Sequence, residues 1–334
     1  MVWIELIVWI KLILCIVVIF ISGRKVARYG DIIAEKTGLG GIWIGLVLVA
    51  ALTSLPELFN GVSAVTLVDA PGLTIGNLLG ANMFNLFNLA LLDIFHRNGS
   101  ILAIVGKTHR LTGIFSLVMV VFVAGFILIS NRFHTMDIGW IGWYTPFIIL
   151  LYVIFARIIY RYEQRHPSLK ETALEYADIS LKTVCLYFSI AAAFIIGAGI
   201  WLPFIGNEIA SIYGWGQSFV GSLFLAFTTT LPEITVSFAA MRMGANDLAV
   251  ANLIGSNLFN LTIIPLDDLL YVKGPVLAAV SETHLVTAST VALMTIVFII
   301  GLSHRHQRLF RLSWWNITLF LLFLLGAYYN FQMA

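Results

Sequence analysis

Ten long apolar stretches constrain the fold of this chain more than any other feature of its sequence. Each is close to the roughly 20 residues that an α-helix needs to cross a bilayer, and they lack the alternating pattern of a membrane β-barrel. Of the 334 residues, 60% are hydrophobic and 11% are charged, against about a quarter charged in soluble domains. This composition excludes a soluble enzyme and a disordered chain, and it predicts an all-α integral membrane protein. The predicted spans are residues 3–23, 41–66, 72–95, 111–130, 138–158, 181–203, 217–241, 246–270, 284–302 and 312–331.

The basic residues predict how these spans are oriented. When successive loops are assigned to alternate sides, 16 of the 19 Lys and Arg residues fall on one side. The positive-inside rule places that side in the cytoplasm, so an even number of spans leaves both termini extracytoplasmic. We expect a multi-pass protein of a plasma membrane or bacterial inner membrane, with the lipid bilayer as its surroundings and no obligatory protein partner. The net charge of +2 gives no reason to expect nucleic-acid binding.

The two halves of the chain carry the same motifs in the same order. Residues 53–57 (TSLPE) recur as 229–233 (TTLPE), an offset of 176, and residues 76–85 (GNLLGANMFN) recur as 251–260 (ANLIGSNLFN), an offset of 175. Chance similarity between apolar helices would not keep one register through so many polar positions. The register continues downstream, where Asp93 matches Asp268 and His109 matches His284.

The repeat predicts the topology. Each half holds five predicted spans, and an odd number makes the second half cross the membrane in the opposite sense to the first. Inverted-topology repeats are typical of secondary transporters. The sequence therefore predicts ten transmembrane helices arranged as two inverted five-helix repeats, residues 1–158 and 181–334, joined by a polar cytoplasmic linker at 159–180.

Two glutamates, Glu57 and Glu233, lie near the middles of the second and seventh predicted spans. Carboxylates at that depth are costly, and they mark functional sites. Each follows a proline, Pro56 or Pro232, which removes one hydrogen bond from the helix. Broken helices at matching positions of two repeats indicate a binding site. A simple kink in a packed helix is the alternative explanation, and the symmetry of the pair argues against it.

Helical spacing brings more oxygen atoms to the same faces. Hydroxyl residues three and four positions before each glutamate share its face of the helix, and polar residues in the following spans recur every four positions. Such an oxygen-only ligand set suits hard cations such as Ca²⁺ or Na⁺. The residues are Thr53, Ser54, Thr229 and Thr230 beside the glutamates, then Asn77, Ala81 and Asn85, and Asn252, Ser256 and Asn260.

Other residues of the motifs have structural interpretations. Asn82 and Asn257 lie one position off the ligand stripe, so hydrogen bonding between helices explains them at least as well as ligation does. The small residues of the second motif, Gly76, Gly80 and Gly255, favour close approach of helices. Near the span ends, we expect interfacial roles for Asp93 and Asp268 and anchoring or capping roles for His109 and His284.

The paired motifs resemble the α-repeats of the calcium/cation antiporter superfamily, most closely those of its sodium/calcium exchanger branch. The resemblance covers about 50 residues of each half. It implies exchange of Ca²⁺ for Na⁺ by alternating access, with no enzymatic activity and no cofactor beyond the transported ions. It also implies that Glu57 and Glu233 are the main Ca²⁺ ligands. The remaining residues that it places around the Na⁺ and Ca²⁺ sites are Ala50, Thr53, Ser54, Asn85, Ala226, Thr229, Thr230, Ser256 and Asn260.

Three positions depart from the family pattern. Ala81 stands where the family often has serine, so one Na⁺ ligand is missing. Ala251 replaces a glycine. Asn260 stands where several members, including potassium-dependent ones, carry aspartate, which argues against K⁺ co-transport and leaves two carboxylates in the centre.

The residues leave the coupling ion open. Two glutamates carry a charge of about −2, which balances one Ca²⁺, two Na⁺ or two protons, so a cation/proton antiporter is the alternative function. A channel is a third possibility, and a closed two-carboxylate site favours alternation over conduction. An intramembrane enzyme is disfavoured because none of the seven histidines lies in the predicted centre.

Overall fold

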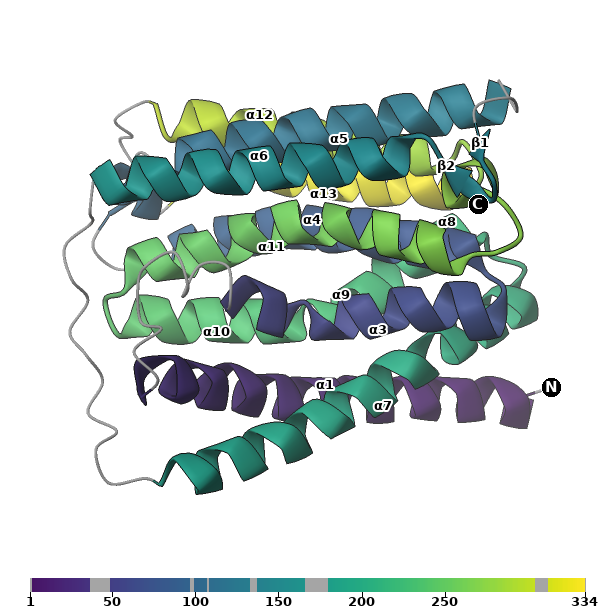
Figure 1. Cartoon of the computed structure of the whole chain (residues 1–334), viewed down its shortest axis with the longest axis horizontal. Helices are drawn as coiled ribbons and strands as arrows, with labels where there is room; N and C mark the ends of the chain where they lie inside the picture. Colours follow the sequence, from purple (N-terminus) through teal and green to yellow (C-terminus); the bar gives the residue numbers. More distant parts are fainter. Residues whose placement is uncertain are drawn as a thin grey trace.

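A computed structural model of the chain describes residues 2–36, 49–96, 99–106, 108–132, 137–165, 180–303 and 312–333. Within these ranges the fold is a helical bundle with one two-stranded hairpin (Figure 1). The main helices are α1 (Val2–Lys36), α3 (Leu55–Ser63), α4 (Pro71–Phe95), α5 (Thr108–Arg132), α6 (Tyr144–Arg165), α7 (Leu181–Tyr213), α8 (Gln217–Val220), α9 (Ala226–Thr229), α10 (Leu231–Arg242), α11 (Asn246–Leu270), α12 (His284–Gly301) and α13 (Trp314–Gln332). The shorter elements are the π-helices η1 (Ala64–Val68) and η3 (Gly221–Leu225), the 3₁₀-helices η2 (Ile101–Ala103) and η4 (Val276–Ala278), and the antiparallel strands β1 (Asp137–Ile138) and β2 (Ile141–Gly142).

Seven of the described helices are long and apolar enough to cross a membrane, or eight when the bent pair Gln217–Thr229 and Leu231–Arg242 is taken as one span. The predicted span 41–66 falls on a shorter apolar helix, Leu55–Val68, and its residues 41–48 lie outside the described ranges. The predicted span 312–331 coincides with α13, whose 19 residues extend about 28 Å. The structure thus establishes a multi-pass helical membrane protein, while the exact count of ten stays a prediction.

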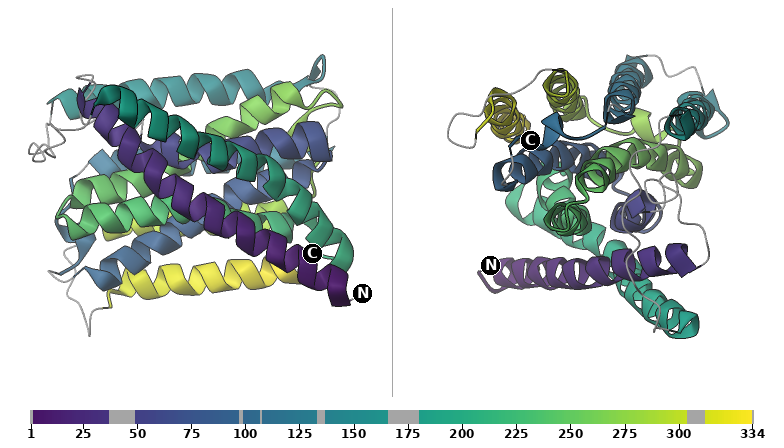
Figure 2. Two further views of the ribbon diagram at one scale, coloured as in Figure 1. Left: turned by 90° about the horizontal axis from the view of Figure 1, so that it is seen from below. Right: turned by 90° about the vertical axis from the view of Figure 1, so that its left-hand side faces the viewer.

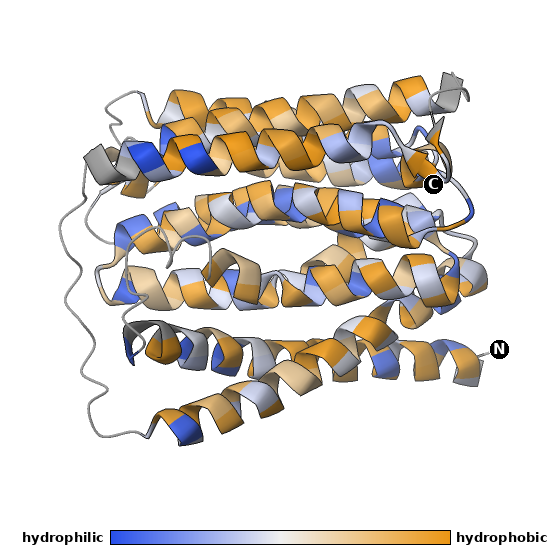
Figure 3. Cartoon of the chain, in the orientation of Figure 1, coloured by the Kyte–Doolittle hydropathy of each residue, from blue (hydrophilic) through white to orange (hydrophobic). Residues whose placement is uncertain are grey.

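The outer surface of the bundle is apolar. Large hydrophobic side chains face outward along the helices, among them Trp3 at 76%, Leu186 at 59% and Leu150 at 57% exposure. Figure 3 shows hydrophobic residues along the lengths of the helices and hydrophilic residues toward their ends. A face of this kind suits contact with lipid chains, because hydrocarbon does not penalise exposed apolar surface.

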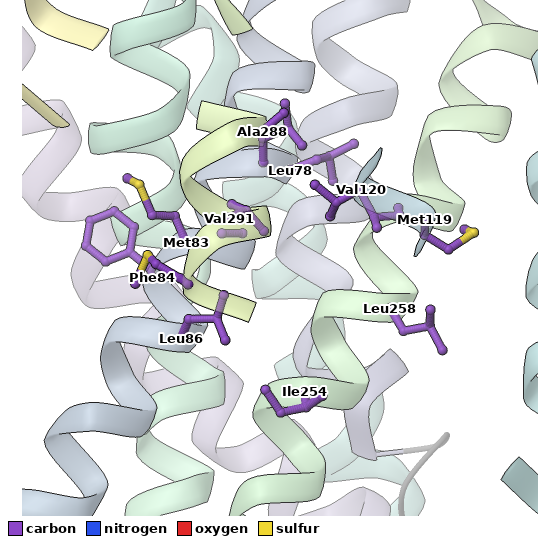
Figure 4. Packing of buried hydrophobic residues seen from close by; sticks show 14 of the residues in the cluster. Leu78, Met83, Phe84, Leu86, Met119, Val120, Ile254, Leu258, Ala288 and Val291 are labelled. Atoms are coloured by element: carbon purple, nitrogen blue, oxygen red, sulfur yellow. The ribbon is translucent and has the colours of Figure 1, made fainter. Parts of the chain in front are cut away.

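Helices α4 and α11 form the centre of the bundle (Figure 1), and 78% and 83% of the residues in their apolar 18-residue stretches are buried. Their side chains interlock with those of α5 and α12 (Figure 4), where Leu78 and Leu86 of α4 and Ile254 of α11 belong to one continuous apolar cluster. This packing fixes the two helices that carry the second motif of each repeat. The polar residues between them are therefore held in place by a rigid frame.

Helices α1 and α7 lie together on one outer face and cross the bundle obliquely (Figure 2). An ion pair joins Lys11 of α1 to Glu208 of α7 at 2.7 Å, and Trp9 donates a hydrogen bond to Tyr213 at 2.8 Å. Helix α7 extends ten residues past the predicted end of its span at 203, which brings Glu208 beside Lys11. Both chain termini lie at one end of the bundle (Figure 1). Of the predicted linker 159–180, residues 166–179 lie outside the described ranges.

Two buried aspartates fasten the loops that follow α4 and α11. Asp93 accepts a hydrogen bond from the Ile101 backbone N–H at 2.5 Å, and Asp268 accepts one from the Val276 N–H at 2.8 Å. The acceptor and donor are eight residues apart in both halves, so the repeat extends into the loops. Both aspartates are fully buried, which gives them a structural role within the protein at the helix ends.

Candidate cation-binding site

Two helix breaks at matching positions create the site. Ser54 (φ −87°, ψ 12°) and Thr230 (φ −80°, ψ 0°) leave helical geometry, and α3 and α10 begin immediately after them. The bend between α9 and α10 measures 42°. Each new helix carries proline in its first positions and glutamate in its first turn. The breaks therefore point two helix N-termini, with their partial positive charge, at the protein centre, where they stabilise negative charge.

Glu57 and Glu233 are both completely buried, and they lie close enough to repel each other electrostatically. The Ser54 hydroxyl donates to Oε1 of Glu233 at 3.1 Å. Within the described part of the chain, both carboxylate oxygens of Glu57 and Oε2 of Glu233 have no hydrogen-bond partner. Buried carboxylate oxygens without partners are expensive, and a bound cation removes that cost.

Threonine–asparagine pairs connect the two repeats across the centre. Thr53 donates to Oδ1 of Asn252 at 3.2 Å, and Thr229 donates to Oδ1 of Asn77 at 3.0 Å. These two contacts are the same contact under the repeat offset, with each half supplying one threonine and one asparagine. The pseudo-two-fold relation is thus present in the side chains as well as in the sequence. Thr53 also lies 3.5 Å from the Ser256 hydroxyl.

The asparagines beyond the ligand stripe hold α4 and α11 together. Asn82 donates to the Asn257 carbonyl at 3.0 Å, and Asn257 donates to the Asn82 carbonyl at 3.1 Å. Asn260 donates its amide to Oδ1 of Asn82 at 3.2 Å, which leaves its own Oδ1 free. Asn85 is fully buried, and neither its Oδ1 nor its Nδ2 has a partner among the described residues. Free amide oxygens on Asn85 and Asn260 remain for a cation.

The other candidate ligands already have partners within their own helices. The Ala50 carbonyl accepts from the Ser54 N–H at 3.0 Å, and the Ala226 carbonyl accepts from the Thr230 N–H at 3.0 Å. The Thr230 hydroxyl also donates to the Ala226 carbonyl, at 2.8 Å. The Thr53 hydroxyl also donates to the Ala50 carbonyl, at 3.2 Å, so each of the two carbonyls accepts at least two hydrogen bonds and would have to exchange one of them for an ion. Side-chain contacts thus join Thr53 to Ser256, Ser54 to Glu233, and Thr229 to Asn77.

The chemistry of this centre is that of oxygen ligands alone. Among the described residues, no group of three or more His, Cys, Asp or Glu side chains is arranged to hold a metal ion, which fits a site with two carboxylates and neutral oxygen donors. Carboxylate, amide and hydroxyl oxygens select hard cations. Ala81 is fully buried at the position matching Ser256, so one half supplies a hydroxyl that the other lacks.

Sequence reasoning missed one buried carboxylate, Asp267. It was not singled out because the repeat matches it to Leu92, while the neighbouring Asp268 has an acidic counterpart. Of the two repeat-matched histidines, His109 contacts Asp247 at 2.9 Å and His284 contacts Ser218 at 3.2 Å, both away from the glutamates.

The described helices define a multi-pass helical membrane protein with two buried carboxylates and neutral oxygen donors in its interior. A model of the family described as sodium/calcium exchanger protein matches residues 7–161 and 183–332. The chain therefore belongs to the sodium/calcium exchanger family, whose members are cation antiporters that carry ions as substrates and are not enzymes.

Individual relatives agree with this assignment. The chain is 26% identical over 315 residues to the sodium/calcium exchanger MaX1 of Methanosarcina acetivorans, covering 77% of this chain and 84% of that protein. It is 26% identical over 261 residues to the inner membrane protein YrbG of Escherichia coli, covering 76% of each. Its fold is similar to that of the sodium-calcium exchanger NCX_Mj, with a TM-score of 0.61 at 20% identity over 95% of this chain and 97% of that one.

Proposed function

We propose that this protein exchanges Ca²⁺ for Na⁺ across the membrane, binding the ions between Glu57 and Glu233. One observation carries the proposal: two completely buried carboxylates at matching positions of the repeats leave three oxygens without hydrogen-bond partners in the described part of the chain. Membership of the family supports antiport, and the similarity to the sodium/calcium exchanger MaX1 supports these two ions.

Charge explains why exchange is obligatory. The paired glutamates carry about −2, which one Ca²⁺ or two Na⁺ neutralises. Burying two unpaired carboxylates costs several kcal/mol per ion, so the empty centre resists the change between its outward-open and inward-open states. A centre loaded with one Ca²⁺ or two Na⁺ is neutral, so it can change between the outward-open and inward-open states. Alternating access of this kind converts competition for one ligand set into antiport.

The moving part is the pair of helices α1 and α7. They lie outside the α4–α11 core, and only 22% and 39% of the residues in their apolar 18-residue stretches are buried. Helices so loosely enclosed slide past a core at lower cost than tightly packed ones. In this proposal the halves 1–158 and 181–334 act as inverted repeats around linker 159–180, and both termini are extracytoplasmic in a plasma or bacterial inner membrane.

The test is ⁴⁵Ca²⁺ uptake into proteoliposomes of purified protein under an imposed Na⁺ gradient, repeated with a proton gradient. We expect uptake that requires the Na⁺ gradient and disappears in Glu57→Gln and Glu233→Gln, since each change removes a ligand charge at constant side-chain size. Glu282→Gln is the matched control because Glu282 is exposed outside the spans, and it keeps full uptake. Uptake driven only by the proton gradient would show that H⁺, and not Na⁺, is the coupling ion. Normal uptake in either Glu57→Gln or Glu233→Gln would refute the site.

A further inference from the structure

Asp267 of α11 is a completely buried carboxylate outside the glutamate centre. Its Oδ2 accepts a hydrogen bond from the Thr74 hydroxyl of α4 at 2.6 Å. Its Oδ1 has no hydrogen-bond partner among the residues that the structure describes. By contrast, the adjacent Asp268 uses both oxygens, accepting from Tyr144, Thr145 and two backbone N–H groups. Asp267 therefore has no comparable structural role to account for it.

The Asp267 carboxylate packs directly against Gly61 of α3, an approach that only glycine allows. A Cβ atom at Gly61 of α3 would lie 2.5 Å and 2.8 Å from the two Asp267 oxygens and 2.9 Å from the Thr74 hydroxyl. Real Cβ atoms do not approach heavy atoms so closely, so a side chain at 61 would displace the carboxylate. Helices α3, α4 and α11 thus meet at one polar point, where both Asp267 oxygens lie against the Gly61 backbone.

Helical spacing places this point on the axis of the central site. Gly61 is one turn after Glu57 on the same face of α3, and Thr74 is about one turn before Asn77 on α4. Asp267 is two turns after Asn260 on α11. Residues three, four or seven positions apart share a helix face, so all three helices extend their ligand faces to the same place. It lies toward the end of the bundle that holds both termini, where α3 ends and α4 begins (Figure 1).

The opposite half of the protein has no equivalent. Under the repeat offsets of 175 and 176, the counterparts of Asp267 and Thr74 are Leu92 and Ala249, and the counterpart of Gly61 is Ser237. The carboxylate and its supporting hydroxyl are thus present on one side of the centre only. A scaffold requirement shared by both repeats would not produce this difference.

We propose that Asp267, with Thr74, forms a second cation-binding site that holds one Na⁺ between the glutamate centre and the end of the bundle at the termini. The proposal extends the exchange function above by placing an ion on the route into the centre. The adjacent Asp268 is also buried, but its two oxygens already accept four hydrogen bonds, so Asp267 is the carboxylate left to an ion. One available carboxylate among neutral oxygen donors favours a monovalent cation over a divalent one. Oxygen donors provide the ligand chemistry that Na⁺ requires.

The test is equilibrium ²²Na⁺ binding to the purified full chain in detergent. We expect Asp267→Asn to bind one fewer Na⁺ per chain than the unmodified protein, while Asp69→Asn, at an exposed position, binds the same number. The variant with both Glu57→Gln and Glu233→Gln, which disables the centre, retains one Na⁺, and adding Asp267→Asn to it removes that ion. An unchanged count in Asp267→Asn overturns the proposal.

The same measurement separates this inference from the proposed function. If the central site does not bind Na⁺, the two glutamine substitutions leave the count unchanged, yet Asp267→Asn still lowers it. Gly61→Ala provides a variant that keeps the charge and displaces the carboxylate, and Thr74→Val removes only the hydroxyl. Both variants lower the affinity of the second site for Na⁺ without changing the number of carboxylates. Size-exclusion profiles confirm that each variant is folded, and a folded Gly61→Ala with normal Na⁺ affinity contradicts the assigned geometry.

Discussion

A close backbone approach joins α4 to the π-helix η3, and it depends on Gly80. A Cβ atom at this position would meet the Ser222 carbonyl oxygen, Cα and carbonyl carbon, all nearer than the 3.0 Å that real Cβ atoms keep. Backbone atoms cannot rotate aside as a flexible side chain does. Gly80→Ala therefore pushes α4 and η3 apart.

The size of the effect follows from two opposed terms. Overpacking of a close-packed interior costs about 1–3 kcal/mol, and a clash with backbone belongs at the upper end. Alanine recovers about 1 kcal/mol of helix propensity relative to glycine. Gly125 of α5 provides the matched control, since a Cβ there meets nothing within 4 Å and Gly125→Ala gains the propensity alone. Because both variants gain the propensity term, it cancels in the comparison, and we expect them to differ in unfolding free energy by about 1–3 kcal/mol, toward the upper end.

The assay is thermal unfolding of the detergent-solubilised protein, with both alanine variants measured side by side. Gly80→Ala melts several degrees below the unmodified protein and Gly125→Ala melts at or above it. The displacement also separates Thr229 from Asn77, because Asn77 lies on α4 and η3 continues directly into α9, which carries Thr229, so ⁴⁵Ca²⁺ exchange falls in Gly80→Ala. Equal melting of the two variants would refute the close approach of α4 and η3.

Three further sets of substitutions test other contacts. Asn82→Ala and Asn257→Ala each remove one hydrogen bond from a side-chain amide to a backbone carbonyl, and each lowers the unfolding free energy in mixed micelles by about 1 kcal/mol. Because each substitution leaves the carbonyl acceptor of the other bond in place, the two losses add, and a silent Asn257→Ala would contradict the pairing. Asp268→Asn replaces an acceptor of four hydrogen bonds by a group that donates at one atom, and unfolding is eased by about 2–4 kcal/mol, while the exposed Asp69→Asn is silent. Lys11→Met or Glu208→Gln alone leaves one charge of a partly exposed ion pair without its partner, so each single variant melts below the double variant. The coupling energy of the pair is about 1 kcal/mol. If the effects of the two single substitutions on unfolding free energy simply add in the double variant, the pair does not join α1 to α7.

The repeat made the glutamate centre predictable. Glu57 and Glu233 stand out in the sequence because the same proline–glutamate pair occurs twice inside apolar spans, and the offset aligns Thr53 with Thr229 and Asn77 with Asn252. Their cross-pairing could not be deduced from periodicity, which describes one helix and does not say which helices meet. It follows from the inverted packing of α4 and α11, a long-range property of the folded chain.

Features without a repeat partner were harder to predict. Asp267 aligns with Leu92, so comparison of the halves passed over it, and only its burial against Gly61 separates it from a loop aspartate. The Lys11–Glu208 pair joins residues 197 positions apart and becomes visible only because α7 continues beyond residue 203. Backbone ligands such as Ala50 carry no side-chain signal at all, and their position depends on where each helix breaks.

The differences between the halves determine how the two faces of the centre differ, and Ala81 is the sharpest case. Its counterpart Ser256 lies 3.5 Å from the Thr53 hydroxyl, so one half presents a hydroxyl toward the centre where the other presents a methyl group. Ala81→Ser restores the missing oxygen at a completely buried position. One hydrogen-bond-strength contact is about 1 kcal/mol, or roughly fivefold in affinity. We therefore expect Ala81→Ser to lower the Na⁺ concentration for half-maximal exchange by that factor, and Ser256→Ala to raise it. If Ser256→Ala raises the Na⁺ concentration for half-maximal exchange while Ala81→Ser leaves it unchanged, the pseudo-symmetry of the backbone does not extend to the ligand positions. The hydroxyl at position 256 then has no equivalent role at position 81.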